Sequence, residues 1–182
     1  MKQFVYSPLV LVILSMLMGL IGCTCGEKSP GLPSEKSLPE PVEGVYITPT
    51  GIEAKPGQEI KFEIKIKPSG WGVSGCEINL SFNGRIMEET EIEFGDFLGS
   101  HPIVGLKQVD NQDGVLKLAL ARVGKTPVPS PPGVLAAVKC KILDSASSGT
   151  YHLEFTKVGL ADEYFQDITN IKIQGTTINV GR

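Results

Sequence analysis

Apolar and polar residues alternate in short runs along the chain from about residue 43 onward. The clearest run covers residues 58–67, where Lys or Glu separates apolar positions two residues apart. The apolar members are Ile60, Phe62, Ile64 and Ile66. A period of two residues puts these side chains on one face of a strand, so the run predicts a half-buried β-strand.

Further runs predict strands of the same kind, separated by turn signals rich in Gly, Pro and Asn-Gly. They cover residues 45–48, 76–82, 87–94, 115–123, 135–142, 151–155 and 168–180. No stretch of about a dozen residues has the 3.6-residue period of an amphipathic helix. Short strands at regular spacing predict an all-β domain, and a two-layered sandwich is the packing that this pattern favours.

The N-terminal segment has a different pattern, in which Lys2 precedes an almost wholly apolar run over residues 9–21. The run ends in Leu20-Ile21-Gly22-Cys23, which resembles the lipobox of a prokaryotic lipoprotein. The resemblance implies that residues 1–22 are a signal peptide and that the Cys23 thiol receives lipid. The mature protein would then lie on the extracellular face of the cell membrane, or on the outer membrane if the cell has one. A plain signal peptide and an uncleaved anchor of about 20 apolar residues are the alternatives.

Residues 23–42 connect this cysteine to the rest of the chain. They include Pro30, Pro33, Pro39 and Pro41 among small and charged residues, with little to bury. Such a composition predicts an extended, semi-rigid tether. Residues 43–182 then form one domain of ordinary size, held at the membrane through the acylated Cys23.

Charge and motif content exclude several functions. The formal net charge is −3, and loss of Lys2 with the signal peptide changes it to −4. No basic cluster offsets this charge, so we expect no nucleic-acid partner. His101 and His152 are the two histidines, and neither has a neighbour at metal-ligand spacing. The segment from Asp110 to Gly114 lacks calcium-loop spacing and predicts a hairpin turn. We expect no enzyme activity and no cofactor in this chain.

Seven segments of strands and turns follow one another in a characteristic order along the domain. They are Ala54-Lys-Pro-Gly-Gln-Glu-Ile, Gly72-Val-Ser-Gly-Cys-Glu-Ile-Asn-Leu-Ser-Phe, Phe94-Gly-Asp-Phe-Leu-Gly, Gly133-Val-Leu-Ala-Ala-Val-Lys-Cys-Lys-Ile, Gly149-Thr-Tyr, Phe155-Thr-Lys-Val-Gly-Leu-Ala-Asp and Ile173-Gln-Gly-Thr-Thr-Ile-Asn-Val. This order resembles the cohesin domain, the receptor module of cellulosome-type assemblies. The resemblance implies a nine-stranded β-sandwich with jelly-roll topology. It also implies a partner that carries a dockerin, a small calcium-loaded helical module, bound on the flat sheet of strands eight, three, six and five.

The pattern of residues 115–123 indicates one open sheet face. If Leu116, Leu118 and Leu120 face the core, the small and apolar residues between them face outward. Under the resemblance, outward residues of neighbouring strands border this surface with polar groups. The predicted partner-binding residues are Gly75, Glu77, Asn79, Ser81, Lys117, Ala119, Ala121, Ala137 and Lys139. Gly75 and Glu77 match positions where cohesins often have Asn and Asp, so Glu77 keeps a carboxylate whereas Gly75 lacks an amide.

Cys76 and Cys140 occupy inward positions of two strands that pair if the chain has the cohesin topology. A disulfide between neighbouring strands is one interpretation, because an extracellular compartment is oxidising. Two buried thiols that pack as small hydrophobic groups are the other.

A carbohydrate-binding module is the alternative function, because many such modules are also β-sandwiches. Sugar platforms usually need two or three coplanar aromatic rings. The candidates after the leader are Trp71, Tyr46, Tyr151 and Tyr164, which the sequence does not bring together. We therefore expect a protein partner rather than a polysaccharide or a small molecule.

Overall fold

The computed structural model describes residues 43–124 and 128–182, and every regular element in these ranges is a β-strand. The strands are β1 (Gly44–Thr48), β2 (Gly51–Ala54), β3 (Glu59–Lys67), β4 (Gly75–Ser81), β5 (Met87–Phe94), β6 (Ile103–Asp110), β7 (Val115–Ala121), β8 (Gly133–Ile142), β9 (Gly149–Ala161), β10 (Lys172–Gln174) and β11 (Thr176–Val180). The all-β prediction is confirmed. No helix in the described ranges is long and apolar enough to span a membrane.

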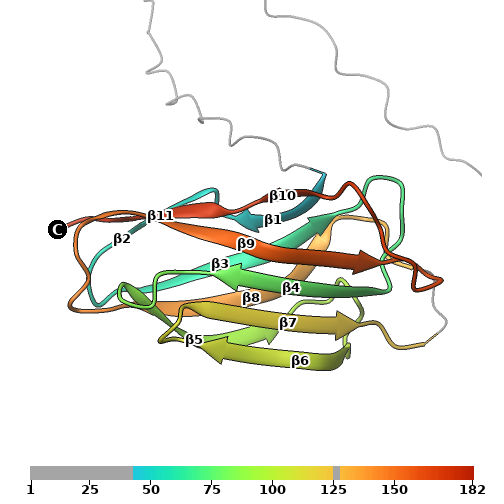
Figure 1. Ribbon diagram of the computed structural model, residues 1–182, viewed down its shortest axis with the longest axis horizontal. Helices are drawn as coiled ribbons and strands as arrows, with labels where there is room; N and C mark the ends of the chain where they lie inside the picture. The colour runs from blue at the N-terminus through green and yellow to red at the C-terminus, as the bar shows by residue number, and fades with distance from the viewer. Residues whose placement is uncertain (1–42, 125–127) are drawn as a thin grey trace, which may run out of the picture. The chain divides into compact units, whose positions relative to one another are not determined.

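The strands form two sheets that pack face to face as a jelly-roll sandwich (Figure 1). One sheet has the order β10-β1-β3-β8-β5, and the other has the order β2-β11-β9-β4-β7-β6. The pairs β1–β10 and β2–β11 are parallel, whereas the other neighbours are antiparallel. If β1 with β2 and β10 with β11 each count as one interrupted strand, the eleven described strands reduce to the nine that were predicted.

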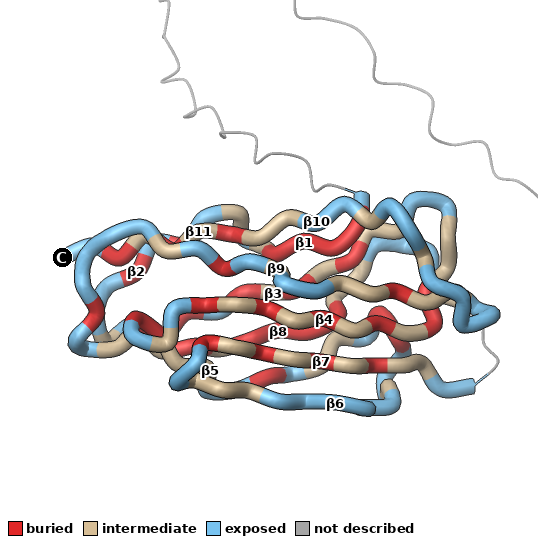
Figure 2. Tube along the Cα trace, viewed as in Figure 1, coloured by how far each residue is buried: buried red, intermediate tan, exposed pale blue. Residues whose placement is uncertain are grey.

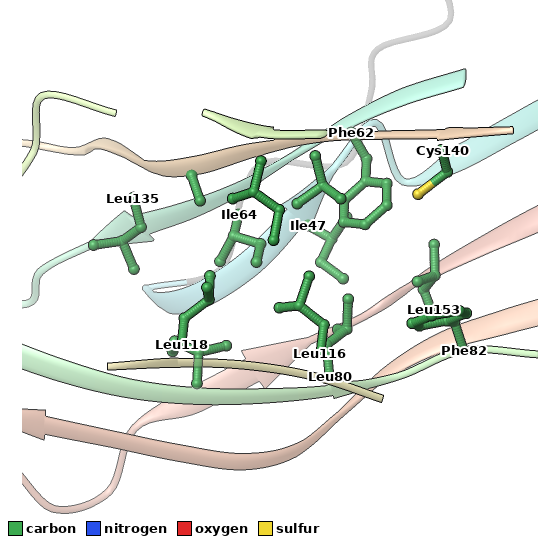
Figure 3. Packing of buried hydrophobic residues seen from close by; sticks show 14 of the residues in the cluster. Ile47, Phe62, Ile64, Leu80, Phe82, Leu116, Leu118, Leu135, Cys140 and Leu153 are labelled. Atoms are coloured by element: carbon green, nitrogen blue, oxygen red, sulfur yellow. The ribbon is translucent and has the colours of Figure 1, made fainter. Parts of the chain in front are cut away.

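The core lies between the sheets and is built from the alternating residues seen in the sequence. On β3, Phe62, Ile64 and Ile66 are almost fully buried, and Leu116 and Leu118 of β7 approach them from the opposite sheet (Figure 3). Burying each such side chain contributes about 1.5–3 kcal/mol. The inward positions of the two sheets therefore supply the main stabilising term of the fold.

The sequence pattern did not predict β2 and β6, and β9 is longer than predicted. β2 has only four residues, so its alternation is too short to detect. β6 lies at the edge of its sheet, and Figure 2 shows it exposed along most of its length. Its apolar residues therefore do not alternate with polar ones. β9 continues to Ala161, where the sequence had predicted an end at Phe155.

The predicted signal peptide (1–22), the lipidation of Cys23 and the tether (23–42) lie outside the described residues. They remain predictions from the sequence.

Candidate functional site

The outer face of β9, β4, β7 and β6 is the candidate functional surface. These four strands lie side by side in that order (Figure 1). Residues paired across antiparallel strands project from the same face, so the register divides this surface into four rows. Counted with β1–β2 as one strand, they are the eighth, third, sixth and fifth strands, as the predicted binding face requires.

The first two rows form a surface that we call the apolar half. The first row contains Ala161, Gly75, Ala121 and Ile103. The second row contains Gly159, Glu77, Ala119 and Leu106. Glu77 is the single charged member. Ile103 is 56% exposed and Leu106 is 37% exposed, so β6 adds large apolar side chains to a floor of Gly and Ala. The Gly and Ala residues of β9, β4 and β7 are partly exposed, and an apolar surface of this kind that remains open to solvent is a candidate interaction site.

The other two rows form the polar half. The third row contains Lys157, Asn79, Lys117 and Gln108, and the fourth contains Glu154, Ser81, Val115 and Asp110. An ion pair connects the halves, since the Lys157 Nζ lies 2.7 Å from the Glu77 Oε2. Both side chains are about half exposed, so this pair orients the groups more than it stabilises the fold.

Asn79 has an unusual environment in the third row. Its side-chain Oδ1 is buried, and no donor among the described residues hydrogen-bonds to it. A buried acceptor without a donor costs about 1–3 kcal/mol, and native structures contain few of them. The Asn79 Oδ1, which lacks a hydrogen-bond donor among the described residues, is therefore a candidate acceptor for a donor from a partner.

The outer face of the five-stranded sheet differs in charge. Lys139 lies between two acidic residues of β5, with its Nζ 2.6 Å from the Glu91 Oε2 and 3.2 Å from the Glu93 Oε1. Lys61 of β3 lies 3.7 Å from the other oxygen of Glu93. The hydrogen bond from Lys139 lowers the pKa of Glu93, and the hydrogen bonds to Glu91 and Glu93 raise the pKa of Lys139. This face is highly charged, and its charges pair with one another.

The prediction that Ala137 and Lys139 share a sheet face with the residues of β4 and β7 is wrong, because both belong to β8 in the five-stranded sheet. Alternation correctly placed them on an outer face, but it did not reveal which sheet contains the strand. Since β6 was missed, residues 135–142 were counted as the sixth strand, whereas they form the seventh. Ala137 is paired with Glu63 and Glu93 and lies within the charged network.

The remaining predicted residues are brought together. Gly75, Glu77, Asn79, Ser81, Lys117, Ala119 and Ala121 occupy adjacent positions of β4 and β7. Sequence reasoning missed the residues of the two flanking strands, chiefly Ile103 and Leu106 of β6 and Lys157, Gly159 and Ala161 of β9. The run Ile103-Val-Gly-Leu was the available signal, since it is apolar and follows Pro102.

Cys76 and Cys140 are both free and buried, and they lie on β4 and β8 in different sheets. The prediction that their strands pair is therefore wrong. Burial raises the pKa of each thiol to about 12, from an ordinary value near 9. Because both thiols are buried in the core, they pack there as small hydrophobic groups.

The described residues contain no group of three or more His, Cys, Asp and Glu side chains that could hold a metal ion. The segment predicted as a hairpin turn does join β6 to β7. Asp110 stabilises this turn, because its Oδ1 accepts hydrogen bonds from the backbone N–H groups of Gln112 and Asp113 at 3.0 and 2.9 Å.

The four candidate aromatic residues lie on different elements and differ in exposure. Tyr46 is buried on β1. Tyr151 lies near the start of the long strand β9, whereas Tyr164 follows its end. Trp71 is partly buried beside the core.

Comparisons with known proteins bear on the family and the fold. A family model of the cohesin domain matches residues 45–180. No curated protein shows significant sequence similarity to the chain.

Several solved structures share the fold. The sixth cohesin of scaffoldin B from Acetivibrio cellulolyticus, in complex with a mutant Cel5 dockerin, has a TM-score of 0.63 and 18% identity over 76% of this chain and 98% of that one. The cohesin of the Coh-OlpA–Doc918 complex from Clostridium thermocellum has a TM-score of 0.65 and 14% identity over 76% and 98%. A non-cellulosomal cohesin from the archaeon Archaeoglobus fulgidus has a TM-score of 0.59 and 17% identity over 76% and 91%. At these identities the likeness shows the fold.

Proposed function

The chain belongs to the cohesin family, and on this premise we propose that it binds a dockerin-bearing protein through the outer face of β9, β4, β7 and β6. Cohesins are non-catalytic protein-binding modules. Two of the similar structures are complexes of a cohesin with a dockerin, which supports the choice of partner.

The observation that carries the proposal is the apolar half of this face. Its floor consists of glycines, which have no side chain, and alanines, which have only a methyl group: Gly75, Gly159, Ala119, Ala121 and Ala161. A helix can lie across such a floor and bury its apolar side chains, which is favourable in proportion to the area removed from water. The opposite outer face offers no comparable surface, because its Lys and Glu side chains pair with one another.

The polar half would orient the partner. Lys157 and Lys117 flank Asn79 in the third row, and the carboxylate of Glu77 reaches Lys157. A partner helix with acidic or hydrogen-bonding groups at one end would match this row, while its apolar part covers the first two rows. Charges of this kind contribute more to register and specificity than to affinity.

The sequence supports a location for this binding. Leu20-Ile21-Gly22-Cys23 and the Pro-rich residues 23–42 favour a lipid anchor and a tether. The chain would retain its partner at the outer surface of the cell, and calcium would belong to the dockerin.

The partner can be tested with the detergent-solubilised mature protein as bait for proteins secreted by the source organism. We expect a bound protein that carries duplicated Asp-x-Asp/Asn-x-Asp/Asn-Gly loops and that dissociates when a chelator removes calcium. Retention on polysaccharide beads that no protein displaces would contradict the proposal and favour the carbohydrate-binding alternative.

The anchor can be tested separately in a cell that expresses the full chain. Cys23→Ser should abolish incorporation of labelled fatty acid and move the protein out of the membrane fraction, because the acylated thiol is lost. The matched control is Cys25→Ser, which should leave both readouts unchanged. Equal labelling of the two variants would exclude Cys23 as the lipidation site.

A further inference from the structure

Two aromatic side chains project from the loop that follows β9. Tyr164 is 73% exposed and Phe165 is 74% exposed, the highest values among the large hydrophobic residues of the described chain. In the free protein these rings bury little surface, so they contribute little to the stability of the fold. Adjacent exposed aromatic residues are a typical feature of protein-binding surfaces.

Hydrogen bonds hold this loop in one conformation. The Oδ1 of Asp162 accepts from the backbone N–H groups of Tyr164 and Gln166, at 2.8 and 2.9 Å. The backbone N–H of Asp162 donates to the carbonyl of Gln166 at 3.0 Å, and that of Phe165 donates to the carbonyl of Asp162 at 3.1 Å. A partner that binds these rings would not have to order the loop first, which favours affinity.

The backbone of Phe165 is strained. Its φ is 59°, in the left-handed region that a bulky residue rarely adopts and that glycine adopts without cost. Strained residues of this kind cluster at functional sites. Because the Phe165 ring is exposed, burial within the chain does not offset the strain of its backbone. We therefore look for a contact between this ring and a binding partner.

The loop continues the apolar half of the binding face. It begins directly after Ala161 of the first row, and Ile103 belongs to the same row. Val123, which is also exposed, follows Ala121 at this end. Figure 1 shows the loop after β9 at the end of the sheet where β7 finishes and β6 begins. Beside the loop, Trp71 and Val128 line a hollow of about 490 Å³ together with Asp162 and Glu163.

We propose that Tyr164 and Phe165 extend the binding face and select dockerins whose helix carries an apolar side chain where it passes the end of the sheet. That side chain would pack on the two rings, which follow Asp162 and Glu163 of the hollow directly in the chain. The inference rests on the proposed binding of a dockerin, and it assigns to this loop a part in the choice of partner.

The test uses the full mature protein and the calcium-loaded dockerin module of the captured partner, with affinity measured by calorimetry. The double variant Tyr164→Ser/Phe165→Ser should bind about ten-fold more weakly or worse, because two aromatic contacts are lost. The matched control is Ile173→Ser, which removes another exposed apolar side chain, on β10 of the other sheet. It should bind as the wild type does.

A second variant separates binding from folding. Phe165→Gly relieves the strain at φ 59°, so its melting temperature should equal or exceed that of the wild type while its affinity falls. Wild-type affinity in both loop variants would overturn the role of the loop. The proposed function would stand in that case if Ala119→Arg, which puts a charge in the apolar half, prevented binding. Failure of the wild-type protein to bind any dockerin would instead overturn the proposed function and the role of the loop with it.

Discussion

Asn79 is the residue where the requirements of folding and of binding conflict most clearly. Its Oδ1 is buried without a donor among the described residues, although polar side chains occupy both neighbouring positions of its row. Asn is also a poor strand former, and a β-branched residue would suit this central strand better. Asn79 lies on an open sheet face and lowers the stability of the free domain. A contact that forms only in a complex with a partner would explain why this position has an asparagine.

Replacing this side chain should separate the two effects. Asn79→Val should raise the free energy of unfolding by about 1 kcal/mol, because an unpaired acceptor is removed, and it should weaken partner binding. Urea denaturation and calorimetry measure the two quantities.

A matched asparagine provides the control. Asn179 on β11 is satisfied, since it accepts from the Thr150 hydroxyl at 2.8 Å and donates to the Glu53 carboxylate at 2.8 Å. Asn179→Val should therefore not stabilise the domain. If Asn79→Val destabilised the protein as much as Asn179→Val does, the unpaired acceptor would not explain the choice of residue.

At the scale of single strands, the sequence predicted those elements that are buried on one face. β3, β4 and β7 alternate because each has one side in the core and one side outside. β6 escaped detection because it is an edge strand with apolar residues exposed, so burial does not impose a period of two. The most exposed apolar residues in the four rows of the candidate surface, Ile103 and Leu106, therefore lie on the strand that the pattern could not find.

The missed strand also explains the error at β8. Alternation fixes which side chains of a strand point outward, but the choice of neighbouring strands depends on long-range topology. Without β6 in the count, Ala137 and Lys139 were assigned to the wrong sheet. Cys76 and Cys140 were assigned to paired strands for the same reason, whereas they approach the core from opposite layers.

At the scale of the whole molecule, the two outer faces differ in a way that the strand pattern alone does not reveal. One face carries Lys and Glu residues that pair across β3, β8 and β5. The other has an apolar half, an ion pair and an unsatisfied amide oxygen on adjacent strands. The sequence motifs predicted the family and seven of the residues on this face. The difference between the two outer faces can be recognised only when the strand order and the pairing of residues across the strands are known.

The anchor and the tether proposed from residues 1–42 would give this organisation a location at the cell surface. A sandwich held by lipid at one terminus and free on one sheet face could recruit a partner without any chemistry of its own. In this proposal the sheet face would carry the binding, and the anchor would only determine where binding takes place.

The most direct test of that claim is calorimetric titration of Ala119→Arg with the calcium-loaded dockerin of the captured partner. Ala119 lies in the middle of the apolar half, opposite Glu77, so the new guanidinium can pair with this carboxylate and leave the free domain folded. Ile173→Arg, on β10 of the other sheet, is the charge-matched control. We predict that Ala119→Arg weakens binding by about 100-fold or more, because a charge is forced into a desolvated contact, while Ile173→Arg binds normally. Wild-type affinity in a folded Ala119→Arg protein would show that the partner binds elsewhere.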